Sequence, residues 1–243
     1  MTLLTSLEVT QLKDWKKDAY IKFKEKITDT IKPFPCIPAV QSFYQNHLRF
    51  SFINDPRNQQ STSQLANILR EYSLLSRSFG KYSTLIVFFQ TPNDLKTNTI
   101  LEFETLFWSQ LTQLHELDQQ EWPECIPLSP TNPEWEFCFH GEQYFMYCAT
   151  PAHKNRNSRS FPYYMFAITP RWVLEEFQST PSYSKKIKSH IRKRLSEYDE
   201  LPPHPNLNSY GKQDNYEWKQ YFLHDTPSSL DACPFLKSLK KKE

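Results

Sequence analysis

A β-hairpin pattern between Trp135 and Cys148 constrains the fold of this chain more than any other stretch. The tetrapeptide His140-Gly141-Glu142-Gln143 is typical of a two-residue hairpin turn, because Gly141 can adopt the positive φ that such a turn needs. Residues opposite each other in a hairpin share a face, so one predicted face is apolar and the other is mixed. The apolar face holds Trp135, Phe137, Phe139, Tyr144, Met146 and Cys148, and the mixed face holds Glu136, Cys138, His140, Gln143, Phe145 and Tyr147.

Composition narrows the classes of protein. Aromatic residues make up 15% of the 243 residues and Gly contributes only three, so large rings must fill the interior. The sequence has neither the glycine fingerprint of dinucleotide-binding folds nor a P-loop. A net charge of +2 is too small to indicate nucleic-acid binding, and no apolar run approaches the roughly 20 residues that span a bilayer. Five irregularly spaced cysteines and a start without a hydrophobic signal core predict a cytoplasmic protein.

The remaining periodicity predicts an α+β fold in which helices flank a mixed sheet of about five strands, including the hairpin at 135–148. We expect one domain over 1–243, with an N-terminal helix within 1–32 that starts at a Thr5–Glu8 capping box, and a frayed basic tail at 236–243. The proline-rich stretch 33–38 is predicted to be extended. Further strands are expected at Leu48–Ile53, 83–90 and 163–168, and further helices from a cap at Ser61 or Thr62 to Gly80, from Pro92 through Leu114, at 173–177 and at 184–198.

The segment after the hairpin is the candidate site. Pro151 interrupts the strand and presents His153 on a loop, followed by the donors Lys154, Arg156 and Arg159. A cofactor that carries both a metal and carboxylates would satisfy the histidine and the basic residues together. A solvated basic loop with a surface histidine is the plainer interpretation.

Other kinds of site are less well supported by the sequence. Zinc binding by Cys138, His140, Cys148 and His153 is opposed by the hairpin register, which directs Cys148 away from Cys138 and His140. The basic stretch 184–198 could bind nucleic acid, but Ile187, Ile191 and Leu195 recur every fourth residue, which predicts an amphipathic helix with its basic face in water. A Cys–His nucleophile pair and a Glu134–Glu136 acid–base pair are unspecific patterns.

Several stretches, taken in order, carry a resemblance to the YqcI/YcgG-like family over about residues 33–235. They are FPC, SFGKYSTLIVFF, LFWSQLTQLHELD, WEFCFHGEQYFMYCATPAHKNRNSRS, ITPRWV, IRKRLSEYD with PPHP after it, DNYEWKQYFL and CPF. The resemblance implies a haem-dependent N-oxygenase that hydroxylates a guanidine or amine nitrogen of a small metabolite. The alternative it leaves open is a haem-binding or haem-sensing protein without oxygenase turnover.

The resemblance also implies the site. Haem b would be the cofactor, with His153 as axial iron ligand and Arg156 and Arg159 at the propionates, and no catalytic residue is expected beyond the haem iron. Cys36 and Cys233 are the reserve ligands, because a thiolate donates more electron density than imidazole.

The expected partners follow from this chemistry. They are dioxygen, an external electron donor or reductase, and a substrate anchored by Glu136, with Glu217 in reserve. No nucleic acid and no membrane are expected, and a homodimer is allowed.

Overall fold

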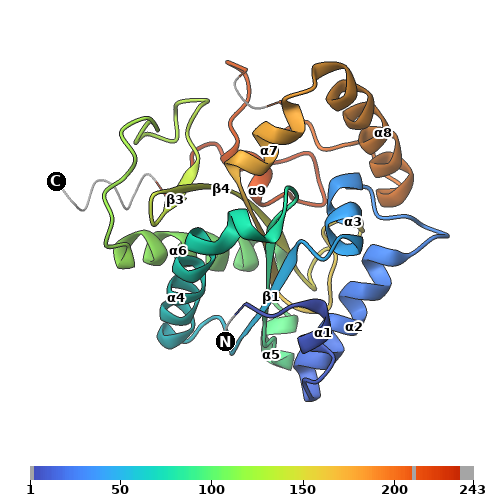
Figure 1. Cartoon of the computed structure of the whole chain (residues 1–243), viewed down its shortest axis with the longest axis vertical. Coiled ribbons are helices and arrows are strands. Elements are labelled where there is room, and N and C mark those ends of the chain that lie inside the picture. The colour runs from blue at the N-terminus through green and yellow to red at the C-terminus, as the bar shows by residue number, and fades with distance from the viewer. Residues whose placement is uncertain (1–2, 210–211, 236–243) are drawn as a thin grey trace.

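A five-stranded mixed sheet in the order β1-β2-β5-β4-β3 forms the centre of the molecule (Figure 1). The computed structural model describes residues 3–209 and 212–235. Strands β1 and β2 are parallel, and the pairs β2–β5, β5–β4 and β4–β3 are antiparallel. The predicted α+β class and the mixed sheet are therefore confirmed.

The described elements have these bounds: α1 Ser6–Val9, α2 Asp14–Thr28, α3 Ile37–Tyr44, β1 Leu48–Ile53, α4 Gln59–Leu75, the 3₁₀ helix η1 Ser76–Phe79, β2 Thr84–Phe89, α5 Asn93–Lys96, α6 Ile100–Leu117, β3 Phe137–Phe139, β4 Glu142–Ala149, β5 Met165–Pro170, α7 Arg171–Gln178, α8 Pro181–Asp199 and α9 Trp218–Tyr221.

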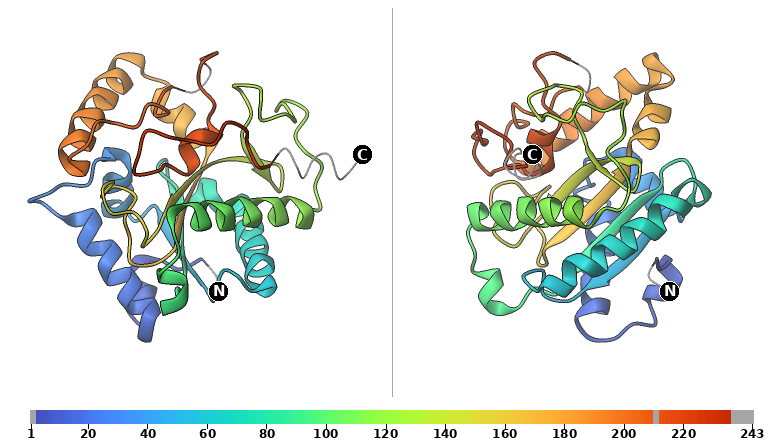
Figure 2. Two further views of the ribbon diagram at one scale, coloured as in Figure 1. Left: turned by 180° about the vertical axis from the view of Figure 1, so that it is seen from behind. Right: turned by 90° about the vertical axis from the view of Figure 1, so that its left-hand side faces the viewer.

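The sheet separates two hydrophobic clusters. The larger cluster joins α4, α6 and residues 216–235, here called the C-terminal segment, to one face. The smaller cluster joins α2 and the start of the chain to the other face. Figures 1 and 2 show α4 and α6 on one side of the sheet and α2 and α3 on the opposite side. Strand β2 is buried on both faces for this reason, and β5 is fully buried on the face that carries Phe166 and Ile168.

The hairpin has the two predicted faces, but its turn lies one residue earlier than predicted. Phe139 pairs with Glu142, so His140 and Gly141 are the turn residues, with φ of 51° and 73°. Two positive φ values are the mark of a type I′ turn, which matches the twist of the strands. His140 tolerates this conformation because its backbone N–H donates to Asp118 at 2.7 Å and its ring bonds to Ser73 at 2.9 Å.

Three predicted element boundaries are wrong. The N-terminal helix starts at the predicted capping box but breaks after Val9 and resumes at Asp14, which has a φ of 55°. The stretch predicted to be extended ends in α3, which has Pro38 in its first turn. Helix α4 begins at Gln59, and the hydroxyls of Ser61 and Thr62 bond elsewhere. The tail 236–243 lies outside the described residues.

Candidate functional site

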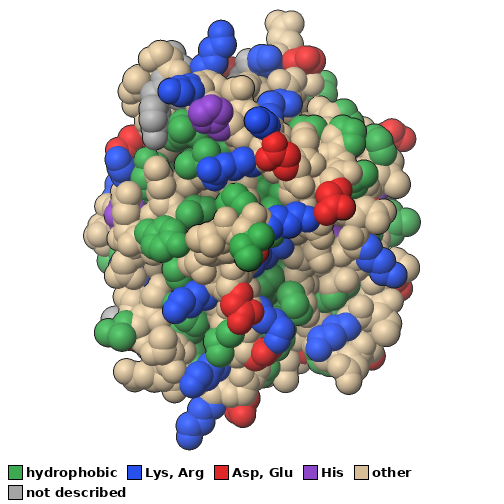
Figure 3. All heavy atoms as spheres, turned by 90° about the vertical axis from the view of Figure 1, so that its right-hand side faces the viewer, with side chains coloured by type: hydrophobic (Ala, Val, Ile, Leu, Met, Phe, Trp, Pro, Cys, Tyr) green, Lys and Arg blue, Asp and Glu red, His purple; other side chains and the backbone are tan. Residues whose placement is uncertain are grey.

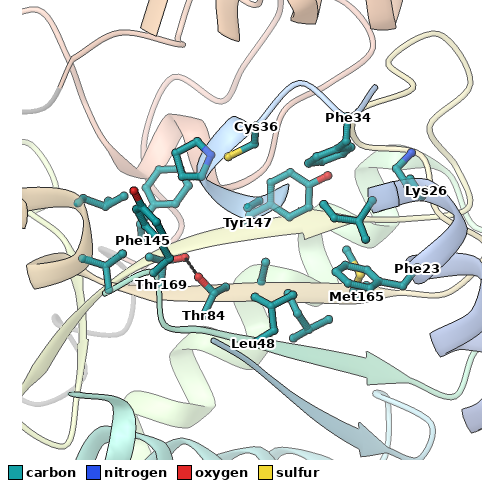
Figure 4. Close-up of a pocket in the computed structure, with 18 residues that line it drawn as sticks. Phe23, Lys26, Phe34, Cys36, Leu48, Thr84, Phe145, Tyr147, Met165 and Thr169 are labelled. Carbon is teal, nitrogen blue, oxygen red and sulfur yellow. Dashed lines mark hydrogen bonds between the residues drawn. The ribbon is translucent and has the colours of Figure 1, made fainter. Parts of the chain in front are cut away.

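An apolar cavity of about 220 Å³ lies on the face of the sheet that α2 and α3 cover (Figure 4). Its floor is a row of side chains brought together by strand register. Leu48 pairs with Thr84, Ile86 pairs with Ala167, and Ala167 pairs with Tyr147. Alternation along pleated strands places every second residue on this face. The floor residues are Leu48, Thr84, Ile86, Phe145, Tyr147, Met165, Ala167 and Thr169.

The roof of the cavity comes from helices and from the segment that joins them. Phe23 and Ile27 lie one turn apart on α2, and Val173 and Leu174 come from the first turns of α7. Residues 34–39, which follow α2 and include the first residues of α3, contribute the cysteine of the FPC motif. The segment's lining residues are Phe34, Cys36, Pro38 and Ala39.

Few polar groups reach this cavity. The lining residues with polar side chains are Cys36, Lys26, Tyr82, Tyr147, and the pair Thr84 and Thr169, whose hydroxyls lie 3.1 Å apart. None of the described residues that line the cavity carries a carboxylate. Burial raises the pKa of the Cys36 thiol, and burial lowers the pKa of Lys26 to about 8 against the opposing attraction of Asp199. The cavity is thus suited to a ligand that is mostly apolar and carries a hydrogen-bond donor or an acidic group at its edge.

The loop that carries His153 is buried, so the expectation of an exposed histidine is wrong. His153 is 2% exposed and bonds through Nε2 to the carbonyl of Leu223 at 2.7 Å and through Nδ1 to Thr150 at 2.8 Å. Its ring packs against Phe222 in the larger hydrophobic cluster. Burial lowers the pKa of His153 to about 4, which keeps the imidazole neutral. Both ring nitrogens have partners within the chain.

The two predicted propionate ligands are also buried and bonded. Arg159 is 4% exposed and donates to the carbonyls of Gln220 and Tyr221 at 2.8 and 2.9 Å. Arg156 donates through Nε to the carbonyl of His224 at 2.9 Å, and its Nη1 lies 3.5 Å from a carboxylate oxygen of Asp199. Arg156 and Arg159, which were predicted to bind a cofactor, therefore contact the C-terminal segment and α8.

Residues 150–160, here called the basic loop, fix two residues of the cavity. The hydroxyl of Tyr147 donates to the carbonyl of Ser158, and Lys26 donates to the carbonyls of Asn157 and Ser160 at 2.7 and 3.1 Å. The guanidinium of Arg159 lies 4.1 Å from the centre of the Tyr147 ring. The basic loop consequently holds Tyr147 and Lys26 in place, through its backbone carbonyls and through Arg159.

The two predicted substrate anchors converge on one arginine. Arg171, in the ITPRWV motif, forms ion pairs with Glu136 and with Glu217, the latter at 3.3 Å. All three side chains are buried, at 0%, 2% and 5% exposure for Glu136, Arg171 and Glu217. Burial raises the pKa of Glu217, and Arg171 and Asn215 oppose that shift. The guanidinium that Glu136 was predicted to bind in a substrate is supplied by the chain itself.

The reserve ligands fall in different places. Cys36 lines the apolar cavity, whereas Cys233 is buried in the larger cluster on the opposite face of the sheet. Sequence reasoning missed Lys26, because its position in a lysine-rich helix resembles a solvated surface. The helical spacing of Phe23, Lys26 and Ile27 was the available signal, since it puts the lysine beside the apolar stripe.

The described residues hold neither a cluster of metal-binding side chains nor a helix that could span a membrane. Among these residues, no three or more His, Cys, Asp or Glu side chains are grouped so that they could hold a metal ion without other ligands. No helix in the described part of the chain is long and apolar enough to cross a membrane.

Comparison with known proteins gives relatives that extend over nearly the whole chain. "Uncharacterized protein YqcI" of Bacillus subtilis (strain 168) is 48% identical over 93% of this chain and 89% of its own length. "Uncharacterized protein YcgG" of the same organism is 44% identical over the same two shares, 93% and 89%. "Putative N(omega)-hydroxy-L-arginine synthase DcsA" of Streptomyces lavendulae is 29% identical over 92% of this chain and 85% of its own length.

No solved structure matches the chain. The sequence profile of the YqcI/YcgG family matches residues 23–236, which include the FPC motif, the basic loop, α8 and the C-terminal segment. The chain therefore belongs to the YqcI/YcgG family.

Proposed function

We propose that this protein is a haem-dependent oxygenase that hydroxylates a guanidine or amine nitrogen of a small metabolite. It would use dioxygen and electrons from an external donor. The N-hydroxylation is supported by the name of the Streptomyces lavendulae relative, which refers to N-hydroxylated arginine. The observation that carries the proposal for this chain is the apolar cavity with a cysteine thiol in its roof.

The cavity offers the groups that haem would need. Haem has a flat apolar macrocycle, acidic propionates and an iron that takes an axial donor, for which a cysteine thiolate is one of the known choices. Phe23, Phe34 and Met165 supply apolar walls and Cys36 supplies the sulfur. Lys26 supplies a cation that lies 5.2 Å from the centre of the Tyr198 ring, at the edge of the cavity.

The basic loop offers these groups less well. His153 could bind iron only after losing its hydrogen bond to Leu223 or to Thr150. Arg159 could bind a haem propionate only after losing its hydrogen bonds to the carbonyls of Gln220 and Tyr221. Breaking hydrogen bonds of buried groups costs about 1–3 kcal/mol for each group left unsatisfied. Cys36 would therefore hold the haem iron more readily than His153, and His153 stays the competing prediction.

When bound, haem supplies the activation of dioxygen, which side chains alone do not provide. The chain itself would hold the cofactor and exclude water from the cavity. Apolar side chains from four strands exclude water, which strengthens every polar interaction that remains. The Thr84–Thr169 hydroxyl pair is a hydrogen-bonding point in the floor for the substrate. Tyr147 is fixed through Ser158 and so gives the wall a defined shape.

The overall reaction requires a reductant. One oxygen atom forms the N–O bond as N–H becomes N–OH, and the other leaves as water after taking up two electrons and two protons. The sequence carries no dinucleotide fingerprint of its own. The proposal therefore includes a separate protein as the electron donor.

The substrate anchor is the finer part of the proposal. Glu136 directly precedes β3, which pairs with β4, the strand that carries Phe145 of the cavity lining, but its carboxylate is bound to Arg171. A guanidinium substrate would have to replace the Arg171 guanidinium. Arg171 is the first residue of α7, whose Val173 and Leu174 form part of the roof. Glu136 or Glu217 can thus act as an anchor only with a shift of α7.

The test is spectroscopic first and catalytic second. Protein from cells supplied with a haem precursor should show a Soret band, and its ferrous carbon monoxide complex should show the red-shifted band typical of thiolate ligation. Cys36→Ser should lose that band, whereas Cys233→Ser should keep it. Incubation with guanidines or amines, dioxygen and a chemical reductant should add one oxygen to nitrogen, as read by mass spectrometry.

Other outcomes lead to defined corrections. If Cys36→Ser keeps the wild-type spectra and His153→Gln changes them, the ligand is His153. Haem without product from any guanidine or amine would identify a haem-binding protein without turnover. If no chromophore is present after supply of the haem precursor, the proposal that the protein binds haem is wrong.

A further inference from the structure

Helix α8 concentrates positive charge on one side of the molecule. Between Pro181 and Leu195 the sequence has six Lys or Arg residues and no Asp or Glu. They are Lys185, Lys186, Lys188, Arg192, Lys193 and Arg194, joined by His190. Since the net charge of the whole chain is only +2, this density is local.

The charge lies on a defined face of the helix. Leu195 and Tyr198 are buried, while Lys185, Lys186, His190 and Lys193 are exposed, the Lys193 side chain at 79%. Lys186 and Lys193 are seven residues apart and so lie on nearly the same side of the helix. Figure 3 shows Lys and Arg side chains gathered around a histidine in the upper part of the side that carries α8. These exposed residues are here called the α8 patch.

The patch carries little compensating acid. Glu197 lies 4.0 Å from Lys193, and both side chains are more than half exposed, so the attraction is weak. The other acidic residue of α8, Asp199, is buried against Arg156 and Ser158. Helix α2 is different, since Asp14, Asp18 and Glu25 are interleaved with its lysines.

The α8 patch lies beside the cavity. Helix α8 follows α7, which supplies Val173 and Leu174 to the roof. At its other end, Tyr198 packs edge to face on Phe34 of the cavity lining, with ring centres 5.8 Å apart. A partner seated on α8 would therefore sit next to the site that needs electrons.

We propose that the α8 patch is the docking surface for a small acidic electron-transfer protein that carries one electron at a time. This inference rests on the proposed function, which requires a reductant from outside. Each encounter delivers one electron to the oxygenation reaction and leaves the carrier oxidised by one electron. Two encounters supply the two electrons that one hydroxylation requires. Small interfaces steered by charge suit such brief contacts, because the carrier must leave after each transfer.

The composition of the patch favours this partner over other polyanions. The exposed side chains described on α8 are Lys, Arg, Ser, His and Glu, without the Phe, Tyr or Trp rings on which successive bases stack or the Asn and Gln amides that pair with adenine. The patch also lacks an apolar anchor for a lipid surface.

A pair of matched variants tests the docking surface. Lys186→Glu with Lys193→Glu reverses two charges of the patch, seven residues apart. Lys17→Glu with Lys24→Glu makes the same change of charge at the same spacing on exposed positions of α2. The probe is a purified acidic flavodoxin labelled with a fluorophore, and anisotropy measures its binding to the full-length protein.

At about 20 mM salt the α8 variant should bind flavodoxin about tenfold more weakly than wild type, and the α2 variant should stay within about twofold. Wild-type binding should fall steeply at about 300 mM salt. Equal weakening by both variants, or no binding by wild type, would overturn the proposal. So would tighter binding of duplex DNA or anionic vesicles that is lost in the α8 variant alone.

The same proteins separate this inference from the proposed function. Binding is measured without haem or turnover, so flavodoxin binding that depends on α8 in a protein without a chromophore would refute the cofactor and keep the docking surface. With haem present, reduced flavodoxin should reduce it about tenfold more slowly in the α8 variant. A normal rate there would place the donor elsewhere.

Discussion

A buried guanidinium keeps its charge only where its planar set of donors finds acceptors. Arg159 meets this condition with three backbone carbonyls, those of Cys148, Gln220 and Tyr221, and with the face of the Tyr147 ring. A lysine has no planar fork and could not reach all of these partners at once. The fold itself requires arginine at this position, before any cofactor is considered.

His204, in the PPHP motif, gives a pH dependence that can be measured. It is 1% exposed, and its Nε2 donates to the carbonyl of Ser228 at 3.3 Å. Burial lowers the pKa of His204 to about 4, below the value of about 6.5 in an unfolded chain. Between these two values the unfolded state binds more protons, so stability falls as the pH falls through this window.

We expect His204→Gln to reduce that loss. The glutamine amide can still donate to Ser228 but does not titrate. Denaturant unfolding at about pH 7 and about pH 4.5 should show a smaller difference in unfolding free energy for the variant, by up to about 3 kcal/mol. The same pH dependence in both proteins would show that His204 is protonated in the folded state at the lower pH.

At this scale the sequence predicted residue types better than their partners. The sequence predicts the arginines of the basic loop to be donors that need acceptors, and it predicts His153 to be an iron ligand. Their acceptors are mostly backbone carbonyls of residues 220–224, and a carbonyl leaves no mark in the sequence. An acceptor outside the chain was therefore inferred where the fold supplies one inside.

Among the elements, two turns depend on glycine in different ways. Gly141 has a φ of 73°, and an added Cβ would lie 2.7 Å from the flexible side chain of Gln120. Gly80 has a φ of 109°, and an added Cβ would lie 2.3 Å from the ring of His47. Gly80 also has a ψ of 168°, a region that residues other than glycine scarcely populate.

The two alanine variants should therefore differ in cost. Gly141→Ala should lower the unfolding free energy by about 1–2 kcal/mol, and Gly141→Asn by less, because asparagine tolerates the left-handed region. Gly80→Ala should cost about 3 kcal/mol or more, since strain and steric overlap add, and asparagine should not restore it. Urea unfolding of the four variants checks the order. A Gly80→Ala protein as stable as Gly141→Ala would show that His47 moves freely.

The elements predicted best were those with a strong period. Strand β1 was predicted with its correct ends, because the alternating apolar residues Leu48, Phe50 and Phe52 indicate a strand and Asn54-Asp55-Pro56 ends it. The break between α1 and α2 depends on a positive φ at Asp14, which periodicity cannot reveal. Helix α3 did have a signal, since proline is favoured in a first helical turn.

For the whole molecule, the cavity could not have been predicted from any one segment. Its lining comes from α2, residues 34–39, α7 and four strands of the sheet. The hairpin pattern did predict that Phe145 and Tyr147 share the mixed face, which is the face the cavity uses. Glu136 and Glu217 converge on Arg171 although they lie 35 and 46 positions away from it in the sequence. Only the fold brings such groups together.

The basic loop and the C-terminal segment are joined at Asp225, which suggests that they open together. The carboxylate accepts from the backbone N–H groups of Lys154, Asn155 and Arg156 at 2.9, 3.1 and 3.0 Å. His153 and Arg156 reach back to the carbonyls of Leu223 and His224. Through Asn157, Ser158 and Ser160 the same loop holds Lys26 and Tyr147 at the cavity.

We expect Asp225→Ala to loosen these contacts as one unit. Bonds to a carboxylate contribute about 1.5–3 kcal/mol, which corresponds to about tenfold to hundredfold faster amide exchange. Hydrogen exchange should rise in residues 154–156 and in 221–224 together, and the strand around Tyr147 should follow because its hydroxyl partner lies in the loop. Asp231→Ala, an exposed acid in the same C-terminal segment, should leave all three regions unchanged. Faster exchange confined to residues 154–156 would mean that the loop moves independently, and that the basic loop does not set the shape of the cavity.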